Sequence, residues 1–327
     1  MTIVPRFTDD IRNATAAVAR AARFVRLNDA QVAPFTQNLL QSRKAQMTDL
    51  DQQTLGGGDT AEEKIAYALA LDAVNFGSGY FELAKQSGVA LEYADLALHL
   101  RRAFHDRGWA DAAAWGSVTA ADCHDVFHIP PGAHAQLDAL MALFARHLNE
   151  AGIRLRDEYG GKAAQLLQAA DGSAEALAAR VGAWDGFKDI GEYAGMSVPI
   201  FKRAQIFAAD VWLALRGSGL ADFSDIDRLT IFADNMVPHV LRHAGVLTYD
   251  AGLAARIDAG HEIAAGSAEE VELRALAIHA VERMRDAAHA MGRTDICAVN
   301  LDHILWNRGY EDDLIVLPRH RTLTVWY

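Results

Sequence analysis

The sequence predicts a mainly α-helical fold, a compact bundle of many helices with at most a short C-terminal strand or hairpin. Only 7 of its 327 residues are proline, the residue that breaks the hydrogen-bond ladder of a helix. Alanine, which has the highest intrinsic helix propensity, is abundant. Two capping boxes, Thr60-Ala-Glu-Glu63 and Ser267-Ala-Glu-Glu270, indicate helix starts because each leads into an amphipathic run.

Further helices follow from apolar residues that recur at the spacing of one helix face. The runs lie near residues 9–26, 93–106, 133–151, 162–170, 174–183, 200–216, 234–245 and 296–306. Only Leu314–Pro318 and Thr322–Tyr327 are rich enough in β-branched and aromatic residues to predict a short strand or hairpin. Because no long polar linker interrupts the chain, we expect residues 1–327 to form a single helical unit; two lobes around a central pocket are the open alternative.

Charge and composition exclude several classes of function. Asp and Glu number 43 against 31 Lys and Arg, a net charge of −12, and such a surface repels a phosphate backbone, so long nucleic acid is not an expected partner. The sequence has no run of 18 apolar residues, so it predicts no membrane span. The N-terminus lacks the pattern of a secretory signal. Cys123 and Cys297 are the 2 cysteines of the sequence and form no CxxC pair, so they cannot make a disulfide framework or a four-thiolate zinc site. We therefore expect a cytoplasmic protein.

Common catalytic motifs are missing, and the remaining short motifs have plain structural interpretations. The sequence has no GxxxxGK[ST] phosphate loop and no GxSxG nucleophile elbow. Gly77-Ser78-Gly79 could be a phosphate nest, but a turn that ends a helix is favoured. His124/His128 and His239/His243 have the i, i+4 spacing that zinc or iron can use. No third ligand accompanies them, so the sequence predicts no metal site and no cofactor.

The segment Leu229–Tyr249 carries the strongest site candidates. Phe232 and Asp234 are two residues apart on a short extended stretch, so their side chains can point the same way. An aromatic face beside a carboxylate suits a flat, nitrogen-rich ligand. The alternative is that Phe232 belongs to the core and Asp234 is the N-cap of the helix that follows.

Two other helices carry polar groups that could join this site. Asp302 lies one turn from Trp306, and His303 one turn from Asn307. The alternative is an ordinary amphipathic helix. Lys202 and Arg203 form a cationic pair at the head of an apolar helix, where they could hold a phosphate or be merely solvated.

Several ordered stretches resemble the queuosine salvage protein family. They are FKRAQIFAADVW, LTIFADNMVPHVLRHAGVLTYD, EEVELRALAIHAVE and LDHILWNRG. The closing residues Arg321–Tyr327 are also similar, and upstream ALDAVNF and SVTAADC follow in the expected order. The resemblance is dense from Phe201 to Tyr327 and weaker before it.

The resemblance implies a largely helical fold similar to DNA glycosylases and hydrolysis of queuosine 5′-phosphate, a small nucleotide, to release the base queuine. It places the catalytic acid on Asp234 and base binding on Phe232 and Asp302. Cleavage of a C–N glycosidic bond builds positive charge on the ribose, which a nearby carboxylate stabilises. We expect His303 and Asn307 to line the base pocket, with Lys202 and Arg203 as the phosphate candidates.

The chain departs from the common family pattern around the base. It has Asn235-Met236 in place of Tyr-Arg, His239 in place of Gln, His303 in place of an aromatic residue and Asn307 in place of an acid. The reaction type is therefore better specified than the base. Three alternatives stay open: hydrolysis of a different nucleotide or nucleoside, a non-enzymatic base-binding module, and a metallohydrolase built on His124/His128.

Overall fold

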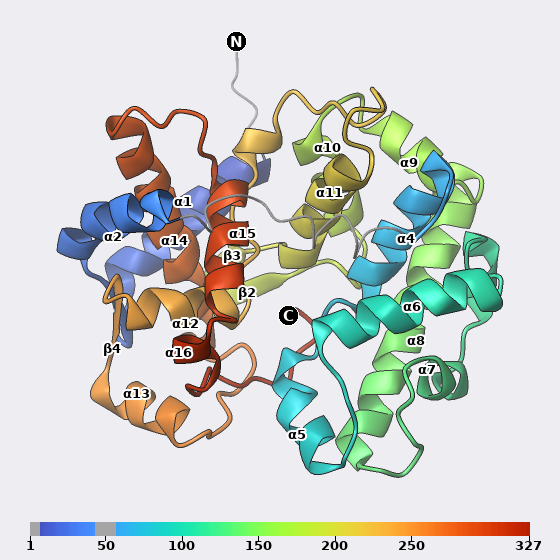
Figure 1. Ribbon diagram of the computed structural model, residues 1–327, viewed down its shortest axis with the longest axis horizontal. Coiled ribbons are helices and arrows are strands. Elements are labelled where there is room, and N and C mark those ends of the chain that lie inside the picture. Colours follow the sequence, from blue (N-terminus) through green and yellow to red (C-terminus); the bar gives the residue numbers. More distant parts are fainter. Residues whose placement is uncertain (1–6, 43–56) are drawn as a thin grey trace. The chain divides into compact units, whose positions relative to one another are not determined.

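The computed structural model describes residues 7–42 and 57–327, and these residues are mainly helical, as predicted (Figure 1). The chain divides into two compact units. The described part of unit 1 comprises residues 7–42, 189–202 and 225–323, and that of unit 2 comprises 57–188, 203–224 and 324–327. The expectation of a single catalytic unit stays a prediction. No helix in the described ranges is long and apolar enough to cross a membrane.

Unit 1 is organised around α14 (Ala268–Ala290), which begins where the second capping motif predicted. The Ser267 hydroxyl accepts a hydrogen bond from the Glu270 N–H at 3.2 Å. Apolar residues of α14, among them Leu273, Ala277 and Val281, lie in the core. Helices packed against α14 are α1 (Phe7–Ala21), α2 (Asp29–Gln41), α12 (Met236–His243) and α15 (Ala298–Arg308). The remaining helices of the unit are η3 (Ile226–Arg228), α13 (Ala251–Asp258) and α16 (Asp312–Ile315).

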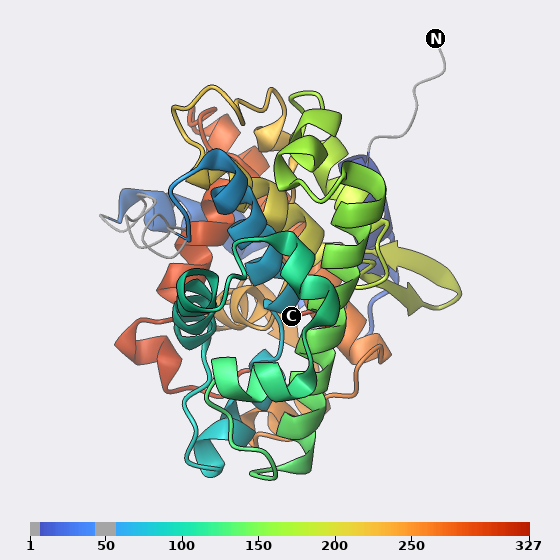
Figure 2. The same cartoon turned by 90° about the vertical axis from the view of Figure 1, so that its right-hand side faces the viewer.

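Two short antiparallel strand pairs complete unit 1. β1 (Val25–Leu27) pairs with β4 (Leu247–Tyr249). β2 (Ile190–Tyr193) and β3 (Met196–Pro199) form the hairpin drawn as yellow-green arrows in Figure 2. Its turn residues Ala194 and Gly195 have φ of +49° and +78°, which are the positive values that a tight hairpin turn requires.

The prediction of a C-terminal strand was wrong. Residues 312–315 form α16, and no strand includes residues 314–327. Asp312 and Asp313 lie in the first turn of α16, where negative charge favours a helix. Arg308 bonds the Asp313 carboxylate at 2.6 and 2.7 Å and so holds this turn against the end of α15. These contacts stabilise a helical turn where the β-branched composition had predicted a strand.

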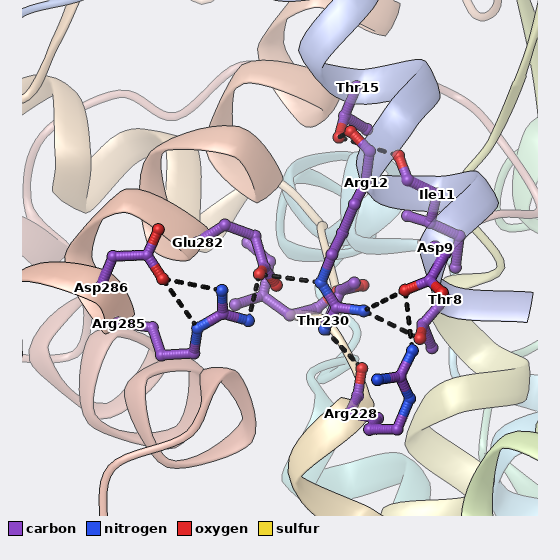
Figure 3. Close-up of polar contacts among 11 residues, drawn as sticks. Thr8, Asp9, Ile11, Arg12, Thr15, Arg228, Thr230, Glu282, Arg285 and Asp286 are labelled. Atoms are coloured by element: carbon purple, nitrogen blue, oxygen red, sulfur yellow. Dashed lines mark hydrogen bonds and ion pairs between the residues drawn. The ribbon is translucent and has the colours of Figure 1, made fainter. Parts of the chain in front are cut away.

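An arginine network ties α1 to the rest of unit 1 (Figure 3). Arg12 Nε donates to Glu282 on α14 at 2.8 Å, and its Nη2 donates to the carbonyl of Arg228 at 2.5 Å. Arg285 also pairs with Glu282. Arg228 in turn donates to Asp9 at 2.7 Å. The first helix is thereby fixed to η3 and α14, which come more than 200 residues later.

Unit 2 is organised around two helices, α4 (Ala61–Val74) and α8 (Ala135–Tyr159). The predicted capping box at Thr60 and Glu63 is present. Gly77 has φ of +105° and lies between the end of α4 and a short helix that begins at Ser78, so this motif starts the next helix and does not cap α4. The other helices are η1 (Ser78–Tyr80), α5 (Phe81–Gln86), α6 (Tyr93–Asp106), η2 (Ala112–Ser117), α7 (Ala120–Val126), α9 (Ala163–Ala169), α10 (Ala174–Gly182) and α11 (Lys202–Ala214), whose first residue, Lys202, belongs to unit 1.

Close backbone packing in unit 2 depends on one helical glycine. A Cβ on Gly152 of α8 would lie 2.9 Å from the backbone nitrogen of Gly116 and 3.0 Å from the carbonyl of Ala112. Trp115, fully buried beside this contact, donates its indole N–H to the Trp109 carbonyl at 2.8 Å. Any side chain at position 152 would therefore push η2 away from α8.

A buried carboxylate anchors β1. Glu272 of α14 has no exposed surface and accepts hydrogen bonds from the backbone N–H groups of Arg23, Phe24 and Val25 at 2.7–3.0 Å. The Tyr193 hydroxyl donates to it at 2.7 Å. We predict that Glu272→Ala lowers the free energy of unfolding by about 3–5 kcal/mol, because it leaves buried donors unpaired.

The matched control is Glu269→Ala on the same helix. Glu269 pairs with Arg256, whose side chain is 43% exposed, so its loss should cost less than about 1 kcal/mol. Urea unfolding of both variants measures the difference. Equal losses of unfolding free energy in the two variants would show that the buried Glu272 bonds stabilise the fold no more than an exposed ion pair does.

Candidate functional site

The segment Leu229–Asn235 runs without helix or strand into α12. Its apolar residues are buried: Ile231 and Ala233 belong to the core of unit 1, and Phe232 is 3% exposed. Buried backbone outside regular structure must find hydrogen-bond partners elsewhere. The side chains that supply those partners define the candidate site.

Asp302 and Phe232, both predicted to bind the base, lie next to each other, and Asp302 contacts the backbone of Phe232. Asp302, on α15, is 5% exposed, and its Oδ1 accepts a hydrogen bond from the Phe232 N–H at 2.9 Å. The neighbouring His303 places its ring edge-on to the Phe232 ring, 6.4 Å between centroids. Three of the predicted base-binding residues therefore lie together.

Asp234 takes the geometry of a helix cap. Its Oδ1 accepts hydrogen bonds from the backbone N–H groups of Met236 at 2.7 Å and Val237 at 3.2 Å, in the first turn of α12. The N-cap position of α12 is Asn235, whose side chain makes no cap bond, so Asp234 caps the helix from the residue before it. Both bonds end on Oδ1, so the cap uses one oxygen of a carboxylate that is only partly buried. Such a cap also fixes the direction of the other oxygen.

Two further contacts to this segment were not predicted. Arg274 of α14 donates from Nε to the carbonyl of Ala233 at 2.9 Å, and the Asn235 side-chain amide donates to the carbonyl of His320 at 3.3 Å. With Asp302 and the cap, every residue from Phe232 to Asn235 makes a polar contact. The one available signal for Arg274 was its charge within the otherwise apolar stretch Leu273–Ile278.

The two phosphate candidates have different surroundings. Arg203 is 1% exposed, and its guanidinium bonds the carbonyls of Asp72, Ala73 and Gly186. It also lies 4.9 Å from the centroids of the Phe76 and Phe187 rings. These contacts give Arg203 a structural role. Lys202, 4% exposed, stands at the first position of α11, with its backbone N–H bonded to the Asp189 carboxylate at 3.2 Å.

Asn307 lies with His303 on α15. Its amide donates to the His303 carbonyl at 2.9 Å, which is a contact one turn back along the same helix. Trp306 packs against Tyr310, with centroids 4.6 Å apart. Asn307 and Trp306 are both partly buried, and α15 as a whole packs on α12 and α14.

The first histidine pair does not have the predicted helical arrangement. α7 ends at Val126, and His128 has φ of +53°. His124 Nδ1 lies 2.8 Å from the Ile129 carbonyl, and the His128 ring packs on His99. Within residues 7–42 and 57–327, no group of three or more His, Cys, Asp or Glu side chains is placed to hold a metal ion.

The second pair does lie on one helix. The His239 and His243 rings on α12 have centroids 4.7 Å apart, and His239 Nε2 lies 3.1 Å from the Leu314 carbonyl. Burial lowers the pKa of His239 to about 4, so the ring is neutral at pH 7 and donates to that carbonyl. His239 therefore ties α16 to α12.

Known proteins of one family are similar to this chain over most of its length. A family model described as "Queuosine salvage protein" matches residues 57–327. A Sphaerobacter thermophilus protein named queuosine 5′-phosphate N-glycosylase/hydrolase is 38% identical over 275 residues, 82% of this chain and 83% of its own length. Proteins of the same name from Mus musculus and Dictyostelium discoideum are 29% and 38% identical. These two alignments cover 87% and 56% of this chain, and 88% and 57% of the relatives.

The buried His239 predicts an acid-sensitive fold. The unfolded chain binds a proton at this residue as the pH falls below about 6.5, whereas the folded chain binds it only near pH 4. Stability should therefore fall across this window. We expect His239→Gln, which can keep the bond to the Leu314 carbonyl without titrating, to reduce the stability lost between pH 7 and pH 5 by about 1–2 kcal/mol.

Urea unfolding at the two pH values measures this effect. The control is His261→Gln, which changes an exposed side chain and should leave the loss as in the unmodified protein. If His239→Gln lost as much stability on acidification as the unmodified protein, His239 would not be a source of the acid sensitivity.

Proposed function

Because the chain belongs to the queuosine salvage protein family, we propose that it is a queuosine 5′-phosphate N-glycosylase/hydrolase that releases queuine. The observation that carries the proposal is the arrangement at residues 232–235. The Asp234 carboxylate is oriented by the first turn of α12 and lies two residues from the buried phenyl ring of Phe232. A second carboxylate, Asp302, accepts a hydrogen bond from the backbone N–H of Phe232.

In the proposed reaction, water replaces the base at C1′ of the ribose. The C1′–N bond breaks, its electron pair leaves with the base, and positive charge develops on the ribose ring. The water oxygen bonds to C1′, and its proton goes to the departing base. No oxidation state changes, so the reaction requires no redox cofactor.

Asp234 is the proposed catalytic residue. Its carboxylate stabilises the oxocarbenium-like ribose or orients the attacking water. The two N–H donors that hold Oδ1 orient the carboxylate before substrate arrives. Preorganised charge of this kind costs no rearrangement in the transition state, which is why it is effective.

The base-binding proposal rests on Phe232, Asp302, His303 and Asn307. The phenyl ring offers a face for stacking, and a carboxylate can accept hydrogen bonds from the N–H edge of a guanine-like base. The bond from the Phe232 N–H to Asp302 ties the acid to the backbone that carries the ring. Asn307 presents both a donor and an acceptor, so it could suit a base that lacks one donor.

Product identification tests the proposed substrate. The purified protein should release queuine from queuosine 5′-phosphate, with ordinary purine nucleotides assayed beside it. Cleavage of the purine nucleotides alone would favour a different nucleotide as substrate, an alternative that His303 and Asn307 raise because they replace common family residues. Absence of base release from every nucleotide would favour a non-enzymatic binding module.

We predict that Asp234→Asn lowers kcat by about 10²–10³-fold, because it removes the charge that stabilises the ribose cation. Asn caps helices as well as Asp does, so the melting temperature should stay nearly unchanged. Steady-state release of queuine, together with thermal unfolding, separates the catalytic role from the capping role.

Asp250 provides a matched control. It caps α13 with the same geometry, its Oδ1 accepting from the Gly252 and Leu253 N–H groups at 2.9 and 3.3 Å. Asp250→Asn should therefore keep full turnover. If Asp234→Asn also kept full turnover, Asp234 would be a helix cap and nothing more.

For the phosphate end of the substrate we propose Lys202 alone. Lys202→Met keeps the length of the buried stem and removes the ammonium group. One charged contact contributes about 1.5–3 kcal/mol, so the KM for queuosine 5′-phosphate should rise roughly 10–100-fold with kcat little changed. The exposed Lys188 supplies the control variant Lys188→Met. A folded Lys202→Met with unaltered KM would remove this residue from the phosphate site.

A further inference from the structure

A buried ion pair lies behind the candidate site. Arg274 and Asp189 have side chains that are each 2% exposed. Arg274 Nη1 donates to Asp189 Oδ1 at 3.0 Å, and Nη2 donates to Oδ2 at 2.5 Å. This two-point contact fixes the plane of the guanidinium. The Nε–H group donates to the carbonyl of Ala233 at 2.9 Å, and Nη1 also lies 3.6 Å from Glu270 Oε1 on the same helix.

Ala233 is the residue between Phe232 and Asp234. Its carbonyl is buried in a segment without regular secondary structure. An apolar side chain at position 274 could fill the volume of arginine but would leave this carbonyl without its donor. A buried ion pair is by itself weak evidence of a contribution to stability. The bond to the Ala233 carbonyl gives Arg274 another role, which is to hold the segment that carries Asp234.

Asp189 extends the same anchor to a second segment. Its backbone carbonyl accepts hydrogen bonds from the Ile200 and Phe201 N–H groups at 3.0 and 3.1 Å, and its Oδ2 accepts from the Lys202 N–H at 3.2 Å. Phe201 has φ of +51°, a conformation that a bulky residue adopts only when its surroundings impose it. One ion pair thus fixes the backbone before Asp234 and the start of α11.

We infer that Arg274 is a positioning residue for the reaction, acting on Asp234 through the Ala233 carbonyl, with Asp189 as the carboxylate that orients it. This inference rests on the proposed function. A displacement of a catalytic group by about 1 Å can cost 10²-fold in rate. Loss of the Arg274 bond therefore impairs turnover beyond any effect on folding.

The first test compares Arg274→Gln with Arg12→Gln. Both arginines bond a carboxylate and a backbone carbonyl in unit 1, but Arg12 contacts the carbonyl of Arg228, outside residues 232–235 (Figure 3). Arg274→Gln should lower kcat about 10²-fold with KM within about threefold. Arg12→Gln should keep kcat within about threefold. Equal kcat values for the two variants would overturn the inference.

The second test combines each arginine variant with Asp234→Asn. If Arg274 acts through Asp234, adding Arg274→Gln to Asp234→Asn should lower kcat by less than about threefold further, because the group that it positions is already disabled. A merely structural role would multiply the two losses. Multiplied losses would therefore overturn the inference.

Asp189→Asn gives a second reading should Arg274→Gln fail to fold. It keeps the volume of the orienting side chain and the arginine itself but removes the charge, so kcat should fall about tenfold with little change in KM. An unchanged kcat in folded Asp189→Asn would show that Asp189 does not orient Arg274 for the reaction. Arg274→Lys keeps the charge but cannot make all three of the bonds to Asp189 and Ala233, and an unchanged kcat in this variant would show that Arg274 is not a positioning residue. Queuine release by the unmodified protein is measured in parallel, since its absence would reject the proposed function rather than the positioning role.

Discussion

The backbone of residues 232–235 is the constraint on which the candidate site depends. Four consecutive residues of a mostly buried segment have no strand or helix ladder to pair with, yet buried polar groups must be paired. Asp302 takes the Phe232 N–H, Arg274 takes the Ala233 carbonyl, and the Asn235 side chain bonds to the His320 carbonyl. A segment held at each residue can place a carboxylate reproducibly.

The same bonds serve stability and the proposed chemistry at Asp234. A side-chain oxygen that accepts the first N–H groups of a helix stabilises that helix, and the positive end of the helix favours negative charge nearby. Because the cap occupies Oδ1, it also orients the carboxylate. Capping and catalysis are therefore compatible interpretations of one geometry, although the sequence presented them as alternatives.

Residues that the sequence grouped in pairs have different surroundings in this fold. The Arg203 guanidinium bonds three carbonyls and stacks on two phenyl rings, whereas the adjacent Lys202 starts α11 with its N–H on Asp189. The two histidine pairs also diverge, since α7 ends before His128 while α12 includes both His239 and His243. Spacing alone did not distinguish these cases, because the end of a helix depends on what packs around it.

The sequence by itself determined the helical class, the start of α4 and α14, and the segment that carries Phe232 and Asp234. These features depend on local chemistry: propensity, capping side chains and apolar spacing act within a few residues. It misplaced the strands, because a strand needs a partner and the pairs that form join residues 25–27 to 247–249 and 190–193 to 196–199. Only the tertiary structure brought Arg274 to the Ala233 carbonyl and Asp302 to the Phe232 N–H, since those contacts join residues 41 and 70 positions apart.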